Sequence, residues 1–161
     1  MILNIFIIGP SGSGKSTIGK LVAEKYHLTF FSISEVIKNE ISTETGFGDE
    51  AKMYINDNKK VPDDLIFDIL VNKLKSIDNQ NFIVSGYPKT LNQGRLAEFY
   101  LRKQNSPCTM LINIDKPVEE PEDISSLKDY FETKSKFLQV DGTKPTEEVF
   151  EAIVKKIETL K

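Results

Sequence analysis

An eight-residue stretch near the N-terminus has the residue types and spacing of a phosphate-binding loop. It reads Gly-Pro-Ser-Gly-Ser-Gly-Lys-Ser over residues 9–16 and satisfies the pattern Gly-x-x-x-x-Gly-Lys-[Ser/Thr]. Glycines let the backbone bend without Cβ clashes and approach an anion closely. Lys15 would place a cation on the β- and γ-phosphates of a nucleoside triphosphate, and the Ser16 hydroxyl would be a ligand of Mg²⁺. The stretch therefore predicts a triphosphate site.

The segments on either side of this loop are those that such a site requires. An apolar run over residues 2–8 precedes it, as a buried parallel strand would. Ile18, Leu21 and Val22 follow at helical spacing. The N-terminus of this helix would add unpaired N–H groups and a favourable dipole for an anion. A glycine-rich turn that matched by chance would not need this strand-loop-helix setting.

Composition limits the class of protein. With 161 residues, 39% apolar and 28% charged, the chain is expected to form one domain over residues 1–161. The net charge of −3 gives no electrostatic case for binding nucleic acid or an anionic membrane. Cys108 is the single cysteine, which excludes a disulfide within the chain and fits a reducing compartment. We therefore expect a cytoplasmic protein, working as a monomer on small molecules.

Apolar periods and turn residues predict alternating strands and helices, and hence a parallel sheet covered on both faces. The expected strands span residues 2–8, 29–31, 82–84, 109–114 and 137–140. The expected helices after the first span residues 32–41, 49–56, 62–74, 91–104 and 125–133, with a last one from 145 onward. Ligands of such sheets bind at the carboxyl ends of the strands. The candidate site segments are therefore the phosphate-binding loop, residues 32–35, residues 85–90 and the chain from Asp115.

Four blocks of the chain resemble the adenylate kinases and related nucleoside monophosphate kinases. They are residues 9–17, residues 58–66, residues 85–90 with Gln93, and residues 140–145. The second block, Asn-Lys-Lys-Val-Pro-Asp-Asp-Leu-Ile, is similar to the family's Gly-Lys-Leu-Val-x-Asp-Glu-Leu-Val. The third, Ser-Gly-Tyr-Pro-Lys-Thr, resembles Asp-Gly-Phe-Pro-Arg-Thr. The resemblance implies a three-layer α/β P-loop fold with strand order 2-3-1-4-5.

The same resemblance implies an activity and a division of labour. The activity would be phosphoryl transfer from Mg-ATP to a nucleoside monophosphate, first of all AMP, with Lys15 and Lys89 catalytic. Residues 32–62 would form the monophosphate-binding insertion, and a shortened lid would span about residues 115–124. The implied ATP-binding residues are Ser11, Gly12, Ser13, Gly14, Lys15, Ser16, Thr17, Thr143 and Lys144. The implied monophosphate-binding residues are Glu35, Lys38, Val61, Gly86, Lys89 and Gln93.

The chain departs from the family pattern where charge matters most. Lys38 and Lys89 stand where the family has arginines, and Ser85 stands where it has an aspartate. Lysine replaces a planar, bidentate phosphate clamp with a point charge. The short segment after Asp115 has none of the family's lid arginines, and we expect its carboxylates at 119–123 to be solvated. These departures predict weakened activity.

Two alternatives stay open from the sequence. One is a nucleotide-binding or regulatory protein of the same ancestry with impaired catalysis, which the missing arginines would favour. The other is a small-molecule kinase of related fold, such as a shikimate or gluconate kinase. Glu35 after the second strand would suit a hydroxylated substrate there, although the second and third blocks argue against it.

Overall fold

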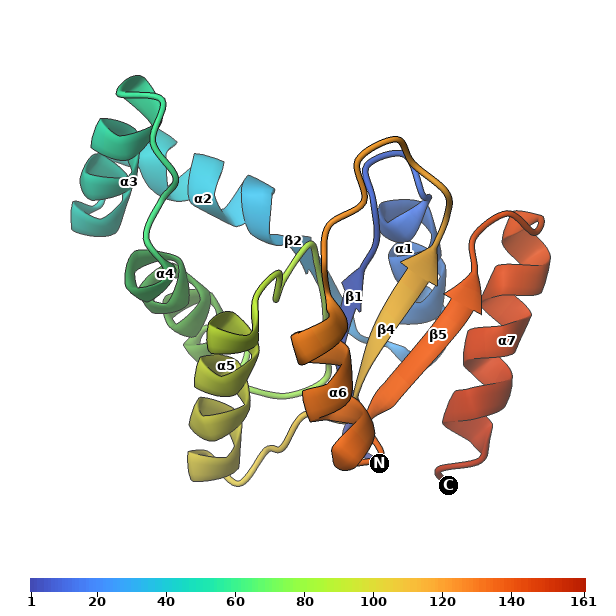
Figure 1. Ribbon diagram of the computed structural model, residues 1–161. Coiled ribbons are helices and arrows are strands. Elements are labelled where there is room, and N and C mark those ends of the chain that lie inside the picture. The colour runs from blue at the N-terminus through green and yellow to red at the C-terminus, as the bar shows by residue number, and fades with distance from the viewer.

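A five-stranded parallel sheet forms the middle layer of the computed structural model, which describes residues 1–161 (Figure 1). The strands are β1 (Asn4–Ile8), β2 (Thr29–Ser32), β3 (Phe82–Ser85), β4 (Met110–Asp115) and β5 (Phe137–Asp141). Their order across the sheet is β2-β3-β1-β4-β5, and every neighbouring pair is parallel. The predicted α/β class, parallel sheet and strand order are confirmed.

The two faces of the sheet are filled by alternate side chains of the same strands, as the period of two requires. Ile5 and Ile7 of β1 join an apolar cluster with α1 (Lys15–Tyr26) and α7 (Thr146–Glu158). Phe6 belongs to the cluster on the opposite face. That second cluster includes residues of α4 (Asp63–Lys75), α5 (Leu91–Lys103) and α6 (Ser125–Thr133). No helix of the chain combines the length and the apolar character that crossing a membrane requires.

Helices α2 (Ile33–Ser42) and α3 (Gly46–Asn56) form an arm that projects beyond the sheet (Figure 1). Helix α2 is capped at its start by Ser32, whose hydroxyl accepts a hydrogen bond of 3.2 Å from the Glu35 N–H. The prediction that α3 begins at residue 49 was wrong. It begins at Gly46 because the Thr45 hydroxyl caps the helix by accepting from the Gly48 N–H at 3.0 Å.

Candidate active site

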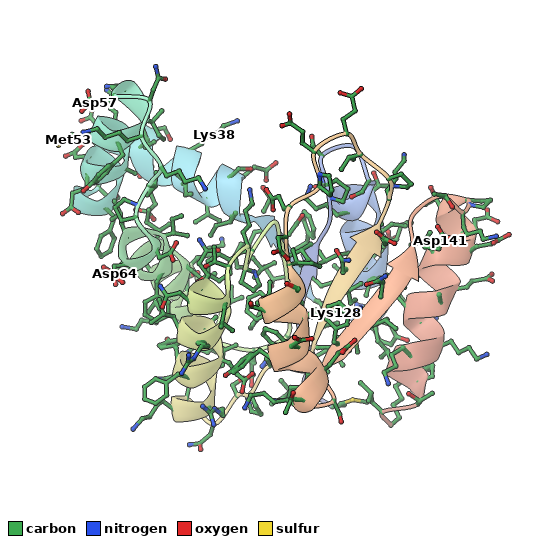
Figure 2. The ribbon with its side chains drawn as sticks, viewed as in Figure 1. Lys38, Met53, Asp57, Asp64, Lys128 and Asp141 are labelled. Carbon is green, nitrogen blue, oxygen red and sulfur yellow. The ribbon has the colours of Figure 1, made fainter.

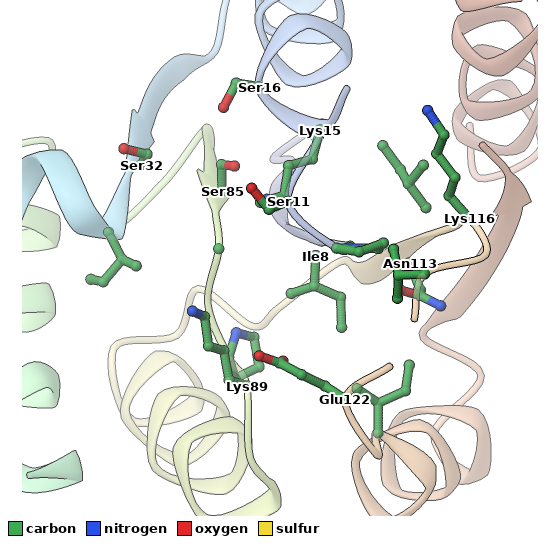
Figure 3. A pocket seen from close by; sticks show the side chains of 18 of the residues that line it. Ile8, Ser11, Lys15, Ser16, Ser32, Ser85, Lys89, Asn113, Lys116 and Glu122 are labelled. Carbon is green, nitrogen blue, oxygen red and sulfur yellow. The ribbon is translucent and has the colours of Figure 1, made fainter. Parts of the chain in front are cut away.

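The carboxyl ends of β1 to β4 open into one cavity of about 680 Å³ (Figure 3). Four segments contribute to its wall: the phosphate-binding loop, the start of α2, the loop between β3 and α5, and the segment 115–124. The segment 115–124 rises beside the phosphate-binding loop in Figure 1. This is the edge at which the strand pattern predicted a ligand site. The volume of the cavity lies in the usual range for a small-molecule pocket, roughly 300–1,000 Å³.

The phosphate-binding loop has the backbone that its glycines permit. Gly12 and Gly14 have φ angles of 80° and 88°, a region that other residues rarely adopt. Helix α1 begins directly afterwards at Lys15, and its first turn carries no acidic side chain. The N–H groups of that turn have no acceptor within the helix. An anion in the cavity would therefore meet N–H donors, a helix dipole and Lys15 together.

A second glycine-containing loop lies opposite, at the end of β3. Gly86 has a φ of 83°, and its N–H donates to the Ile7 carbonyl at 2.9 Å, which fastens this loop to β1. The Lys89 N–H donates to Oε1 of Gln93 at 2.7 Å. Nε2 of Gln93 in turn donates to Oδ1 of Asp63 at 2.9 Å. The backbone of Lys89 is thus held by the side chain of a residue on the next helix.

Three charged side chains face one another across the cavity. Lys15, Lys89 and Glu122 all line it, and Figure 3 shows Glu122 reaching across toward Lys89. Burial lowers the pKa of Lys15, repulsion by Lys89 lowers it further, and attraction to Glu122 raises it. The site therefore brings together positive charge from the start of α1 and from the loop between β3 and α5.

The cavity wall holds only some of the residues that the sequence predicted for the site. Those that line it are Ser11, Lys15, Ser16, Glu35, Gly86 and Lys89. Gly12, Ser13 and Gly14 complete the phosphate-binding loop without lining the cavity, and Thr17 continues α1. Lys38, Val61, Gln93, Thr143 and Lys144 lie outside the wall. Lys38 is on the projecting arm (Figure 2), whereas Lys144 borders a separate cavity of about 310 Å³ between β5 and α7.

The sequence indicated the chain from Asp115 as part of the site but did not identify the individual residues on the far side of the cavity. Asn113, at the end of β4, lines the cavity although it is buried. Glu120 and Glu122 are exposed, as expected, yet they also line the cavity. Lys116 donates from Nζ to the Gly12 carbonyl at 3.4 Å, which links this segment to the phosphate-binding loop. Their place after β4 was a signal for a site, but no spacing rule predicts which way such side chains point.

Two buried hydroxyls at this edge have no hydrogen-bond partner. They are Oγ of Ser13, inside the phosphate-binding loop, and Oγ of Ser85, which lines the cavity. Buried polar atoms are nearly always paired in native proteins. The Ser85 hydroxyl therefore keeps unused hydrogen-bonding capacity at the wall of the cavity.

The order of the strands and the two facing glycine loops define the class of the protein: an α/β protein with a P-loop phosphate site at the carboxyl edge of its sheet. The family model described as adenylate kinase matches residues 7–157. The chain belongs to the adenylate kinase family.

Individual relatives are similar in sequence to nearly all or to part of the chain. In an alignment of 189 positions that covers 99% of each chain, the chain is 31% identical to an adenylate kinase of Azobacteroides pseudotrichonymphae genomovar. CFP2. It is 30% identical over 189 residues to an adenylate kinase of Bacteroides fragilis strain YCH46, covering 99% of this chain and 100% of the relative. An adenylate kinase of Pyrococcus horikoshii is 36% identical over 118 residues, which is 73% of this chain and 53% of that one.

Proposed function

We propose that this protein is an enzyme that transfers the terminal phosphoryl group of Mg-ATP to a nucleoside monophosphate, first of all AMP. An oxygen of the monophosphate forms a bond to the γ-phosphorus, and the bond from that phosphorus to the β–γ bridging oxygen breaks. Two nucleoside diphosphates result. The observation that carries the proposal is the meeting of Lys15 and Lys89 in one cavity.

These lysines suit the chemistry because phosphoryl transfer needs positioning and charge neutralisation more than covalent catalysis. Lys15 and the first N–H groups of α1 would hold the phosphates of ATP. Lys89 and the backbone at Gly86 would hold the phosphate of the acceptor. The hydrogen bond from Gly86 to Ile7 fastens the loop after β3 to β1, the strand that leads into the phosphate-binding loop, so donor and acceptor would be held at a fixed separation.

The residues of the cavity fit a magnesium ion that arrives with the nucleotide. No three His, Cys, Asp or Glu side chains are grouped to hold a metal, and Mg²⁺ is usually bound through substrate phosphates. The Ser16 hydroxyl would be its protein ligand, and Ser85, whose buried hydroxyl is unpaired, lines the same cavity. Bound there, the ion would neutralise charge on the phosphates.

We propose that the predicted insertion and lid close this site. Residues 32–62 contain both helices of the projecting arm (Figure 1), and Lys38 and Val61 lie in that part of the chain. Closure of the arm over the acceptor would bring them to it and exclude water, which limits hydrolysis of ATP. The segment 115–124 would act as the lid. Thr143 and Lys144, in the turn before α7, would contact the adenine of ATP.

The remaining assignments are a cytoplasmic location and a monomeric state. The single cysteine is buried and unpaired, which supports a reducing compartment. The net charge of −3 supports small-molecule partners over nucleic acid.

A coupled assay of diphosphate formation with ATP and each monophosphate in turn tests the proposal. We expect turnover with AMP above that with the other monophosphates. Lys15→Met should reduce turnover at least about 100-fold, since removing one preorganised donor has an effect of that order. Binding of ATP without turnover of any monophosphate would contradict the proposal.

That contradictory outcome would favour a second function, a nucleotide-binding protein without transfer. The observation in its favour is the charge of the lid segment. Glu120 and Glu122 line the cavity from this side. Carboxylates there repel phosphate, whereas arginines would stabilise the transition state.

A further inference from the structure

Asp63 connects the projecting arm with the loop that carries Lys89. It is the first residue of α4, directly after the segment 32–62. Its carboxylate accepts from Nε2 of Gln93 at 2.9 Å and from Nδ2 of Asn92 at 3.0 Å. The Thr90 hydroxyl approaches the same carboxylate at 3.5 Å. The start of α4 is therefore tied to the start of α5 by one carboxylate.

The chemistry of these partners fixes the orientation of the Gln93 carboxamide. The amide oxygen and nitrogen are hard to tell apart by shape, and a network must assign them. Here the backbone N–H of Lys89 can only donate, so it must meet Oε1. The carboxylate of Asp63, when ionised, can only accept, so it must meet Nε2. Flipping the amide would break both hydrogen bonds at once.

A fixed amide presents a fixed order of donor and acceptor. Each of these two bonds uses one of the amide's hydrogens or lone pairs, so one N–H and one lone pair of Gln93 remain. Adenine offers an acceptor at N1 beside a donor at N6, whereas guanine offers a donor at N1 beside an acceptor at O6. An amide that could rotate by half a turn would match either base. An amide held in one orientation matches only one of them at a given position of the base.

We propose that Asp63 is a specificity-determining, positioning residue that orients Gln93 to accept adenine and reject guanine in the monophosphate. This inference rests on the proposed function and on the contact with the adenine of the monophosphate that the family resemblance implies for Gln93. Asp63 does not touch the nucleotide and acts through Gln93. Gln93 also accepts a hydrogen bond from the Lys89 N–H. The contact between Asp63 and Gln93 therefore also fixes the backbone position of the lysine that would face the acceptor phosphate.

The test compares AMP with GMP in Asp63→Ala, both by kcat/KM and by calorimetric Kd. We expect the AMP-to-GMP ratio to fall at least about fivefold, the low end of what one bidentate side-chain contact to a base contributes. The KM for ATP should stay within about twofold, as for a change remote from its site. Asp64→Ala is the matched control, since Asp64 has the same charge in the same first turn but is exposed and makes no hydrogen bond to Gln93. It should keep the wild-type ratio.

Two further variants ensure that the test of Asp63 can be interpreted. Asp63→Asn can still accept from Nε2 through its own oxygen, so it should retain most of the selectivity. Asp63→Ser suits a helix N-terminus but is too short to reach Gln93, and it replaces the alanine variant if that chain does not fold. An unchanged AMP-to-GMP ratio in a folded Asp63→Ala or Asp63→Ser protein would overturn the inference. So would an equal loss for AMP, GMP and ATP, which would indicate a merely structural role.

The proposed function fails separately. A wild-type chain that turns over neither monophosphate refutes phosphoryl transfer, and calorimetry then still measures the AMP-to-GMP affinity ratio in each variant. If wild type binds neither monophosphate, the specificity role falls with the function. If it binds AMP more tightly and Asp63→Ala removes that preference, the role of Asp63 stands without turnover.

Discussion

Lys15 is held among charges that oppose and support its protonation. Burial and Lys89 lower its pKa, and Glu122 raises it. A lysine must be protonated to hold phosphate, so affinity for ATP should fall as the pH rises through this lowered pKa. Loss of ATP affinity at alkaline pH is therefore expected from deprotonation of Lys15.

The Glu122→Gln variant tests this balance, because the direction in which it should change the pKa of Lys15 is defined. Removing the carboxylate takes away the one influence that raises the pKa of Lys15, so that pKa falls further. The alkaline limb of ATP affinity should then move to lower pH than in wild type, as measured by calorimetry from neutral pH upward. Glu119→Gln is the control, since Glu119 is exposed and does not line the cavity. A limb that moves to higher pH in Glu122→Gln would show that Glu122 does not act on Lys15.

At the scale of the elements, the arm depends on a close approach of its two helices. A Cβ on Gly48 of α3 would overlap the backbone carbonyl of Glu40 in α2. Gly48→Ala should therefore lower the free energy of unfolding by about 1–3 kcal/mol, the usual effect of overpacking, in a urea titration. Gly46→Ala is the matched control, because a Cβ there meets nothing within 4 Å and alanine favours a helix. Equal stability of the two variants would contradict the packing described for the arm.

The sequence predicted elements better than it predicted contacts between them. Strand periods and turn residues predicted the five parallel strands, since both are local patterns. The sequence did not predict the early start of α3, because the Thr45 cap consists of a single hydrogen bond, from the Gly48 N–H to the Thr45 hydroxyl. Asn4 is a polar residue in an otherwise apolar strand, and its neighbours in the sequence do not explain why it is there. Its buried amide donates to Ser106 and Pro107 and accepts from the Asn81 N–H, all far away in the chain.

The same limit applies to the site. The phosphate-binding loop was predictable because eight adjacent residues make it. Lys89 was placed by its block and by the rule that strand ends share an edge. The direction of Glu122 depends on how the segment 115–124 crosses the cavity, and the role of Asp63 depends on a contact 30 residues away in the chain. Neither has a local pattern.

At the scale of the whole molecule, the sheet and its two layers of helices should seal the core from reagents. Cys108 is buried, and burial raises the pKa of its thiol to about 12. Only the thiolate reacts readily, so a disulfide reagent should leave the folded chain unmodified and titrate one thiol after denaturation. Rapid reaction of the native protein would show that this part of the core opens easily.

At this cavity, the protein is expected to transfer a phosphoryl group between two nucleotides without releasing it to water. Phosphorus NMR of the protein with Mg-ATP and AMP follows every phosphate at once. We predict that ATP and AMP signals decline together, that those of ADP grow, and that no inorganic phosphate accumulates. Inorganic phosphate in place of ADP, or unchanged nucleotides in the presence of ATP binding, would contradict phosphoryl transfer between the two nucleotides.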